Sequence, residues 1–93
     1  MSKYELVATT SFKKDYKKLV KRQYNITLLD EVVEQLLNGN PLPEKNKDHA
    51  LTGNWKGFRE CHIMPDWLLV YRIYEDKLIL SLIRTGSHSD LDF

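Results

Sequence analysis

Three strand-like segments near the C-terminal end of the chain are joined by connections too short for a parallel arrangement. They span residues 57–63, 67–74 and 77–85, and their apolar residues alternate with polar ones or form short runs. Residues 64–66 separate the first two segments, and a turn near Glu75 and Asp76 separates the last two. Because a parallel pair needs a crossover of about a dozen residues or more, these segments predict an antiparallel sheet.

The N-terminal part of the chain predicts one strand followed by a basic helix. Residues 3–10 alternate enough to indicate the strand. Residues 9–23 have apolar side chains at helical spacing, and Thr10 or Ser11 is the expected N-cap. The apolar positions of this helix are Phe12, Tyr16, Leu19 and Val20.

A second helix follows, with a clear end. It is expected to begin near Thr27, because Asp30 three residues later resembles a capping arrangement. It should end at residues 38–43, because Gly39 suits a left-handed C-cap and Pro41 cannot continue a helix. Its apolar stripe consists of Leu29, Val32, Val33, Leu36 and Leu37.

The order of these elements predicts an α+β fold with one strand, two helices and then an antiparallel sheet. Two helices cover one face of a four-stranded sheet, so the other face is expected to be open and to offer a binding platform. The 93 residues indicate a single domain, residues 1–93. Hydrophobic residues make up 42% and charged residues 29%, a composition typical of soluble globular proteins.

Signals for membrane insertion, secretion and disulfides are missing from the sequence. No run of about 18 apolar residues is present, and the N-terminal residues lack an apolar signal segment, so we expect a cytoplasmic protein without membrane contact. The single cysteine, Cys61, cannot form an internal disulfide or a CxxC motif. Alternation places it on the strand face opposite His62, in the helix-covered core rather than in the role of a nucleophile.

Charge is distributed unevenly along the chain. Residues 1–25 contain seven Lys or Arg against two acidic residues, whereas residues 26–93 contain seven against eleven. A basic segment on a nearly neutral protein can attract a polyanion, although a solvated helix face is the simpler interpretation.

The side chains suited to chemistry lie near the ends of the predicted strands. They are His49, His62, Asp66, Arg84 and His88. His49 is expected in the loop before the sheet. The tight hairpin brings His62 close to Asp66, and Gly86 lets the chain turn sharply so that His88 returns to the same edge.

This set meets the requirements of RNA cleavage. A base must take the proton of the 2′-hydroxyl, an acid must protonate the leaving 5′-oxygen, and a cation must offset the charge on phosphorus. Histidine serves as acid or base, aspartate can orient an imidazole, and arginine matches phosphate. Trp67 or Phe93 can stack on a splayed base. No metal ion is required, and the three histidines lack the close spacing of a zinc site.

Each residue also has a simpler interpretation. A single histidine is often structural, Asp66 is an ordinary turn residue, and Trp67 is a candidate for the core. Arg59, Glu60 and Arg72 can pair with charges across strands. On chemistry alone, RNA cleavage is therefore one candidate among several.

Two motifs carry a resemblance to a known family. They are KDHALTGNWKGFRECHIMPDWLLVYRI at residues 47–73 and LIRTGSHSDLDF at residues 82–93. Together with the basic first helix and the apolar second helix, they resemble the YafQ branch of the RelE/ParE superfamily of type II toxin–antitoxin toxins. The resemblance covers nearly the whole chain. One departure is the tail, where Asp92 separates Leu91 from Phe93.

The resemblance implies a RelE-like fold and a ribosome-dependent mRNA endoribonuclease that inhibits translation without a metal or cofactor. Its implied partners are a cognate antitoxin, mRNA and the ribosome. The catalytic positions would be His49, His62, Asp66, Arg84 and His88, with His88 nearest the scissile phosphate and Arg84 holding it. Trp67 and Phe93 would contact bases. The residues hypothesised to contact ribosomal RNA are Lys13, Lys14, Lys17 and Lys18.

Two other functions are compatible with the same fold. One is a ParE-like toxin that poisons DNA gyrase by binding, and the other is a non-catalytic module that only binds an antitoxin. The complete set of histidine, aspartate and arginine side chains argues against both. Mapping of mRNA ends after in vitro translation separates an endoribonuclease from a gyrase poison, because a gyrase poison leaves mRNA uncut.

Overall fold

The computed structural model describes residues 2–91 and confirms the predicted α+β fold. The three C-terminal strands are β3 (Arg59–Met64), β4 (Trp67–Tyr74) and β5 (Ile79–Gly86), and they pair antiparallel in chain order. The N-terminal strand β1 (Glu5–Ala8) lies at the sheet edge, parallel to β5. The sheet is therefore mixed, with the strand order β1-β5-β4-β3-β2.

The fifth strand was not predicted. It is β2 (His49–Ala50), which pairs antiparallel with β3 so that His49 faces Glu60 in the register. The expectation of four strands, with His49 in a loop, was therefore wrong. A strand of two residues is too short to show an alternating pattern. Its pairing depends on the free edge of β3, which exists only once the sheet has formed.

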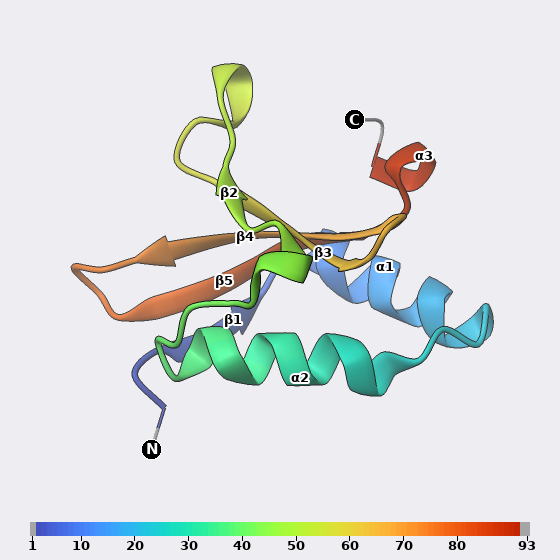
Figure 1. Cartoon of the computed structure of the whole chain (residues 1–93), viewed down its shortest axis with the longest axis horizontal. Helices are drawn as coiled ribbons and strands as arrows, with labels where there is room; N and C mark the ends of the chain where they lie inside the picture. Colours follow the sequence, from blue (N-terminus) through green and yellow to red (C-terminus); the bar gives the residue numbers. More distant parts are fainter. Residues whose placement is uncertain (1, 92–93) are drawn as a thin grey trace.

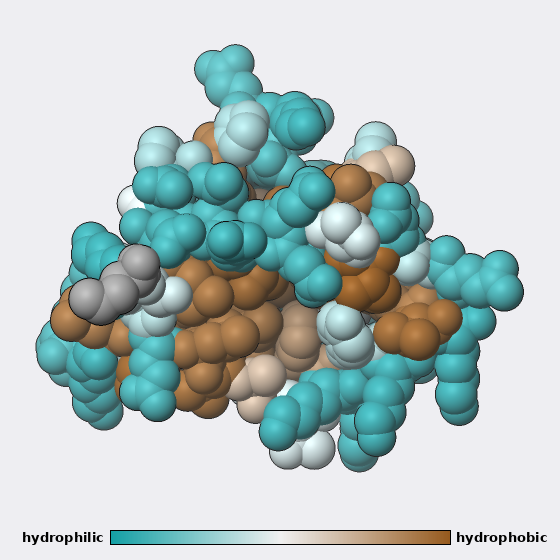
Figure 2. All heavy atoms as spheres, turned by 90° about the horizontal axis from the view of Figure 1, so that it is seen from below, coloured by the Kyte–Doolittle hydropathy of each residue, from teal (hydrophilic) through white to brown (hydrophobic). Residues whose placement is uncertain are grey.

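Both predicted helices pack on the same face of the sheet, α1 (Thr10–Lys21) beside α2 (Ile26–Leu37) (Figure 1). The main core lies between the helices and the sheet. From the sheet it includes Cys61, Leu69, Tyr71, Leu80 and Leu82, and from the helices Phe12, Leu19, Leu29, Val32, Val33 and Leu36. Figure 2, seen from the helix side, shows an apolar area toward the middle with hydrophilic side chains around it. The apolar residues of the helices and of the strands thus pack together in one core.

The N-cap of α1 is Thr9, one residue earlier than expected. Its hydroxyl oxygen accepts from the backbone N–H of Phe12 at 3.0 Å and donates to the carbonyl oxygen of Ile83 at 2.8 Å. The prediction of Thr10 or Ser11 was therefore wrong. The contact with β5 explains the choice, because only Thr9 lies at the junction of the strand and the helix.

The start of α2 also differs from the prediction, whereas its end agrees with it. Asn25 occupies the N-cap position and makes no side-chain capping hydrogen bond, so the capping arrangement expected at Thr27 is wrong. At the other end Gly39 has a φ of +75°, and its N–H donates to the carbonyl oxygen of Leu36 at 3.0 Å. This is the left-handed C-cap that the glycine predicted.

The sheet face opposite the helices carries a second, smaller core. Leu68, Val70 and Leu91 are buried there, and Leu51, Trp55, Phe58 and Ile83 pack against them. Figure 1 shows the segment after β2 and the short helix α3 (His88–Leu91) on this side of the sheet. The expectation of an open face was wrong for this region, because isolated apolar residues in loops can cover a sheet without any periodic signal.

Among the described residues, none of the helices combines the length and apolar character that crossing a bilayer requires.

Candidate active site

The hairpin between β3 and β4 places His62 and Asp66 at its tip. Met64 pairs with the first residue of β4, so only Pro65 and Asp66 connect the strands. The ladder is irregular between His62 and Met64. The Nδ1 atom of His62 lies 3.2 Å from the carbonyl oxygen of Pro65. The turn itself therefore orients this imidazole.

The C-terminal tail folds back onto the hairpin after Gly86. At this glycine φ is +153°, and a Cβ atom would lie 2.9 Å from the Cβ of Asp90, so a larger residue would be strained. In α3, the backbone N–H of His88 donates to Oδ1 of Asp66 at 3.1 Å, and its Nδ1 lies 2.5 Å from the same oxygen. The predicted proximity of His62, Asp66 and His88 is confirmed.

The contact between Asp66 and His88 determines which nitrogen of the His88 ring carries the proton. A carboxylate only accepts hydrogen bonds, so Nδ1 of His88 carries the proton and Nε2 is left for proton exchange. The hydrogen bond from His88 lowers the pKa of the Asp66 carboxyl group. The His62 and His88 ring centroids are 5.9 Å apart. Two imidazoles from distant parts of the sequence thus share one surface.

Glu60 lies between His49 and His62. Its Oε1 atom is 3.5 Å from Nε2 of His49 and 4.0 Å from Nε2 of His62, and the residue is only 8% exposed. The Nδ1 atom of His49 lies 2.7 Å from the carbonyl oxygen of Lys47, which leaves Nε2 directed toward the carboxylate. One nearly buried carboxylate thus lies beside Nε2 of both histidines.

Sequence reasoning assigned Glu60 to a cross-strand ion pair and missed this position. The available signal was its spacing of two residues from His62, which places both side chains on one face of a strand. Its register partner His49 could not be recognised, because the strand β2 was not predicted.

Arg84 does not join the histidines. Its Nε and Nη2 atoms donate to the two carboxylate oxygens of Asp15 in α1, at 2.6 and 3.2 Å. The expectation that its guanidinium shares a pocket with the imidazoles was therefore wrong. Asp15 is 8% exposed and lies among lysines of a basic helix, and a buried carboxylate needs such a partner.

Trp67 packs in the main core. It is 3% exposed, its Nε1–H donates to the hydroxyl of Thr85 at 3.0 Å, and its ring meets that of Tyr24 edge-on at 4.9 Å. The ring also lines a cavity of about 430 Å³ beside Asp66, and its stacking on a base stays a prediction. Its apolar area and its N–H group are both satisfied inside the protein.

The other residues predicted to contact RNA are four lysines and Phe93. The lysines predicted to contact ribosomal RNA are all exposed on α1, namely Lys13, Lys14, Lys17 and Lys18. Phe93 lies outside the described residues, so its contact with a base stays a prediction.

Cys61 lies in the helix-covered core, as predicted. It is fully buried, and burial raises the pKa of its thiol to about 12. A thiolate is therefore not formed at neutral pH. Within residues 2–91, no group of three or more His, Cys, Asp or Glu side chains is arranged to hold a metal ion.

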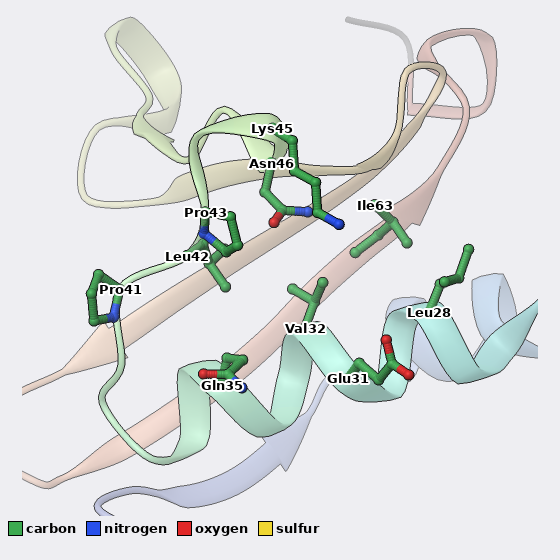
Figure 3. A pocket seen from close by; sticks show the side chains of 10 residues that line it. All are labelled: Leu28, Glu31, Val32, Gln35, Pro41, Leu42, Pro43, Lys45, Asn46 and Ile63. Carbon is green, nitrogen blue, oxygen red and sulfur yellow. The ribbon is translucent and has the colours of Figure 1, made fainter.

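One cavity of the protein lies beside α2. It has a volume of about 630 Å³ and lies between α2 and residues 41–46, with Val32 and Ile63 among its lining residues (Figure 3). None of the predicted site residues lines it. The chemistry therefore concentrates at the hairpin tip rather than in this cavity.

Comparison with known proteins gives one consistent result. Residues 4–92 match the family model described as the bacterial toxin of type II toxin–antitoxin systems, YafQ. The mRNA interferase toxin YafQ of Escherichia coli (strain K12) is 43% identical over 81 residues, which is 86% of each chain.

Solved structures agree with this result. The E. coli DinJ–YafQ toxin–antitoxin complex contains a chain with a TM-score of 0.88 and 36% identity, covering 96% of this chain and 97% of that one. A metal-bound toxin from Helicobacter pylori has a TM-score of 0.89 and 46% identity, covering 95% and 98%.

Proposed function

The chain belongs to the YafQ family of bacterial type II toxins, and from this premise we propose that it is an mRNA interferase that cuts mRNA on the ribosome. The observation that carries the proposal is the Asp66–His88 pair with the His62 ring 5.9 Å away. This is the acid–base equipment that an endoribonuclease requires and that a gyrase poison does not need. An mRNA substrate also places the site of action in the cytoplasm.

Cleavage needs two proton transfers, which we assign to the histidines. One imidazole takes the proton of the 2′-hydroxyl, whose oxygen attacks the adjacent phosphorus. A second imidazole gives a proton to the 5′-oxygen as its bond to phosphorus breaks. His88 acts nearest the scissile phosphate through Nε2, because Asp66 holds its Nδ1 proton. Asp66 then stabilises the imidazolium that forms.

We assign the remaining proton transfer to His62 and His49. Glu60 lies within 4.0 Å of both Nε2 atoms and places one negative charge beside the two imidazoles. We assign the positive charge near the phosphate to the imidazole that holds a proton before giving it to the 5′-oxygen. The terminal Phe93 keeps its proposed role as a base contact.

An antitoxin is the expected protein partner. The E. coli relative at 36% identity is solved in the DinJ–YafQ toxin–antitoxin complex. We expect the ribosome to be a second partner, contacted by the lysines of α1 through the phosphates of its RNA.

The test is induction of the toxin in bacterial cells, followed by mapping of cleaved mRNA ends. His88→Ala should slow cleavage about 100- to 10,000-fold, because it removes one proton-transfer group. Ser89→Ala, at the neighbouring exposed position of α3, is the matched control and should cleave like the wild type. Antitoxin binding and the melting temperature should not change in either variant. Full cleavage by His88→Ala would refute the assignment, and intact mRNA with wild-type toxin would refute the activity.

A further inference from the structure

The strand β2, which carries His49, is too short to hold its own position. It consists of two exposed residues at the edge of the sheet. A pairing of this length is not stable by itself, so side chains outside it must fix where the imidazole lies. Two sets of contacts do so, one before the strand and one beneath it.

The contact before the strand is made by Asn46. This side chain is buried, and its Nδ2 atom donates to the carbonyl oxygen of His62 at 2.7 Å. The chain then passes through Lys47, whose φ of +46° lies in the left-handed region. The carbonyl oxygen of Lys47 lies 2.7 Å from Nδ1 of His49. Residues 46–49 are thereby held along β3.

The contacts beneath the strand form a network of three side chains, namely Asp48, Arg59 and Tyr71. Oδ1 of Asp48 accepts the hydroxyl of Tyr71 at 2.5 Å. The two oxygens of the carboxylate also accept Nε–H and Nη2–H of Arg59, at 3.4 and 3.2 Å. The Tyr71 hydroxyl accepts from Nε of Arg59 at 3.3 Å, so each member contacts the other two.

Tyr71 connects this network to the middle of the protein. It belongs to the central strand β4, pairs with Arg59 in the register and is 1% exposed. Burial raises the pKa of its phenol group, so the hydroxyl keeps its proton and donates it to the carboxylate. Because Tyr71 packs in the main core, the network lies on the helix-covered side of the sheet. His49 lies on the other side, next to Glu60.

We propose that Asp48, Arg59 and Tyr71 are positioning residues for His49 in the cleavage of mRNA. The proposal rests on the proposed function, in which His49 takes part in proton transfer. The network sets where β2 lies along β3, and therefore where Nε2 of His49 lies. A displacement of about 1 Å can slow a reaction about 100-fold. A hydroxyl in the core therefore controls the rate from the opposite side of the sheet.

Tyr71→Phe tests the proposal, because it removes one hydroxyl and keeps the ring in the core. It should lower kcat for ribosome-bound mRNA about five- to tenfold and leave KM nearly unchanged. Tyr4→Phe is the matched control. Tyr4 is buried in the same core, and its hydroxyl donates to a carboxylate oxygen of Glu75 at 2.6 Å. This control should lose a similar hydrogen bond and keep the kcat of the wild type.

A double-mutant cycle separates positioning of His49 from a general loss of stability. In the background of His49→Ala, Tyr71→Phe should change kcat very little, because the group that it positions is gone. An equal loss of kcat in the two backgrounds would overturn the proposal. Asp48→Asn replaces a partly exposed side chain and gives the same test if Tyr71→Phe does not fold.

Nitrogen NMR of the histidine rings gives a measurement that needs no RNA. In the wild type the contact with Lys47 should keep the proton on Nδ1 of His49. Tyr71→Phe should move the His49 signals toward those of a mixture of tautomers, whereas the His88 signals stay unchanged. Unchanged His49 signals would also overturn the proposal. Failure of the proposed function would appear instead as uncut mRNA with the wild-type toxin.

Discussion

At the scale of single residues, Glu60 adds a carboxylate to the predicted set of histidines. Its carboxylate is nearly buried and lies beside the Nε2 atoms of two histidines. Such a carboxylate can act on either imidazole through its negative charge. Arg84 and Trp67 differ from Glu60, because their N–H groups are hydrogen-bonded to Asp15 and Thr85 and not to the histidines.

Glu60→Gln should lower kcat about tenfold and leave KM nearly unchanged. The amide keeps the shape but removes the charge that stabilises a protonated histidine in the transition state, and a tenfold loss corresponds to about 1.4 kcal/mol. Cleavage of ribosome-bound mRNA is the measurement. Glu44→Gln, at an exposed position, is the matched control. A kcat equal to that of the wild type would show that the carboxylate has no part in the reaction.

At the scale of elements, the short helix α3 is held by the carboxylate of Asp90 in addition to that of Asp66. Oδ2 of Asp90 accepts the backbone N–H of Ser87 at 3.0 Å and a guanidinium N–H of Arg22 at 2.8 Å. Helix α3 thereby gains a contact with the end of α1, although four residues form too few internal hydrogen bonds to be stable alone. The position of His88 therefore depends on side chains far from it in the sequence.

Asp90 should make the stability of this element depend on pH. The hydrogen bond from Ser87 and the contact with Arg22 lower the pKa of Asp90 from its ordinary value to about 2. A carboxyl group with a lowered pKa stabilises the folded state above its unfolded pKa of about 3.9, and this contribution is lost as the pH falls toward about 2.

Asp90→Asn should therefore reduce the free energy of unfolding by about 1–2 kcal/mol at pH 7, and the difference from the wild type should shrink as the pH falls from about 4 to about 2. Urea unfolding at several pH values measures this. Asp76→Asn removes an exposed carboxylate from a turn and is the control. A difference between Asp90→Asn and the wild type that stays constant down to pH 2 would contradict the assignment.

At the scale of the whole molecule, charge is separated between the ends of the sequence. Most of the positive charge of residues 1–25 is carried by α1, whereas residues 26–93 have an excess of four acidic residues, eleven against seven. The net charge of +1 conceals this asymmetry. A polyanion such as ribosomal RNA would therefore be attracted most strongly to the exposed lysines of α1.

Reversal of the α1 charges should weaken ribosome association about a hundredfold or more at low salt and flatten its salt dependence, because fewer counterions are released. The variant replaces with Glu the residues Lys13, Lys14, Lys17 and Lys18. The matched control makes the same net change at exposed lysines elsewhere, namely Lys3, Lys45, Lys56 and Lys77. Similar losses in both variants would show that total charge, not the basic helix, governs binding.

Much of the architecture was predictable from local patterns. The strands β3, β4 and β5 follow from alternation and short connections, and both helices follow from their apolar stripes. The glycines at positions 39 and 86 indicated where the chain turns. The return of His88 to Asp66 was predictable for the same reason, since a tight hairpin and one permissive glycine leave few other paths.

The sequence by itself determined which elements form, because periodicity and turn residues act over a few positions. Only the tertiary structure decided the pairing of β2, the cover over the second sheet face, and the partners of Glu60, Trp67 and Arg84. These features depend on which free edge or buried charge lies nearby after the chain has folded. Such neighbours come from positions far apart in the sequence, 69 residues for Asp15 and Arg84, and no local pattern records them.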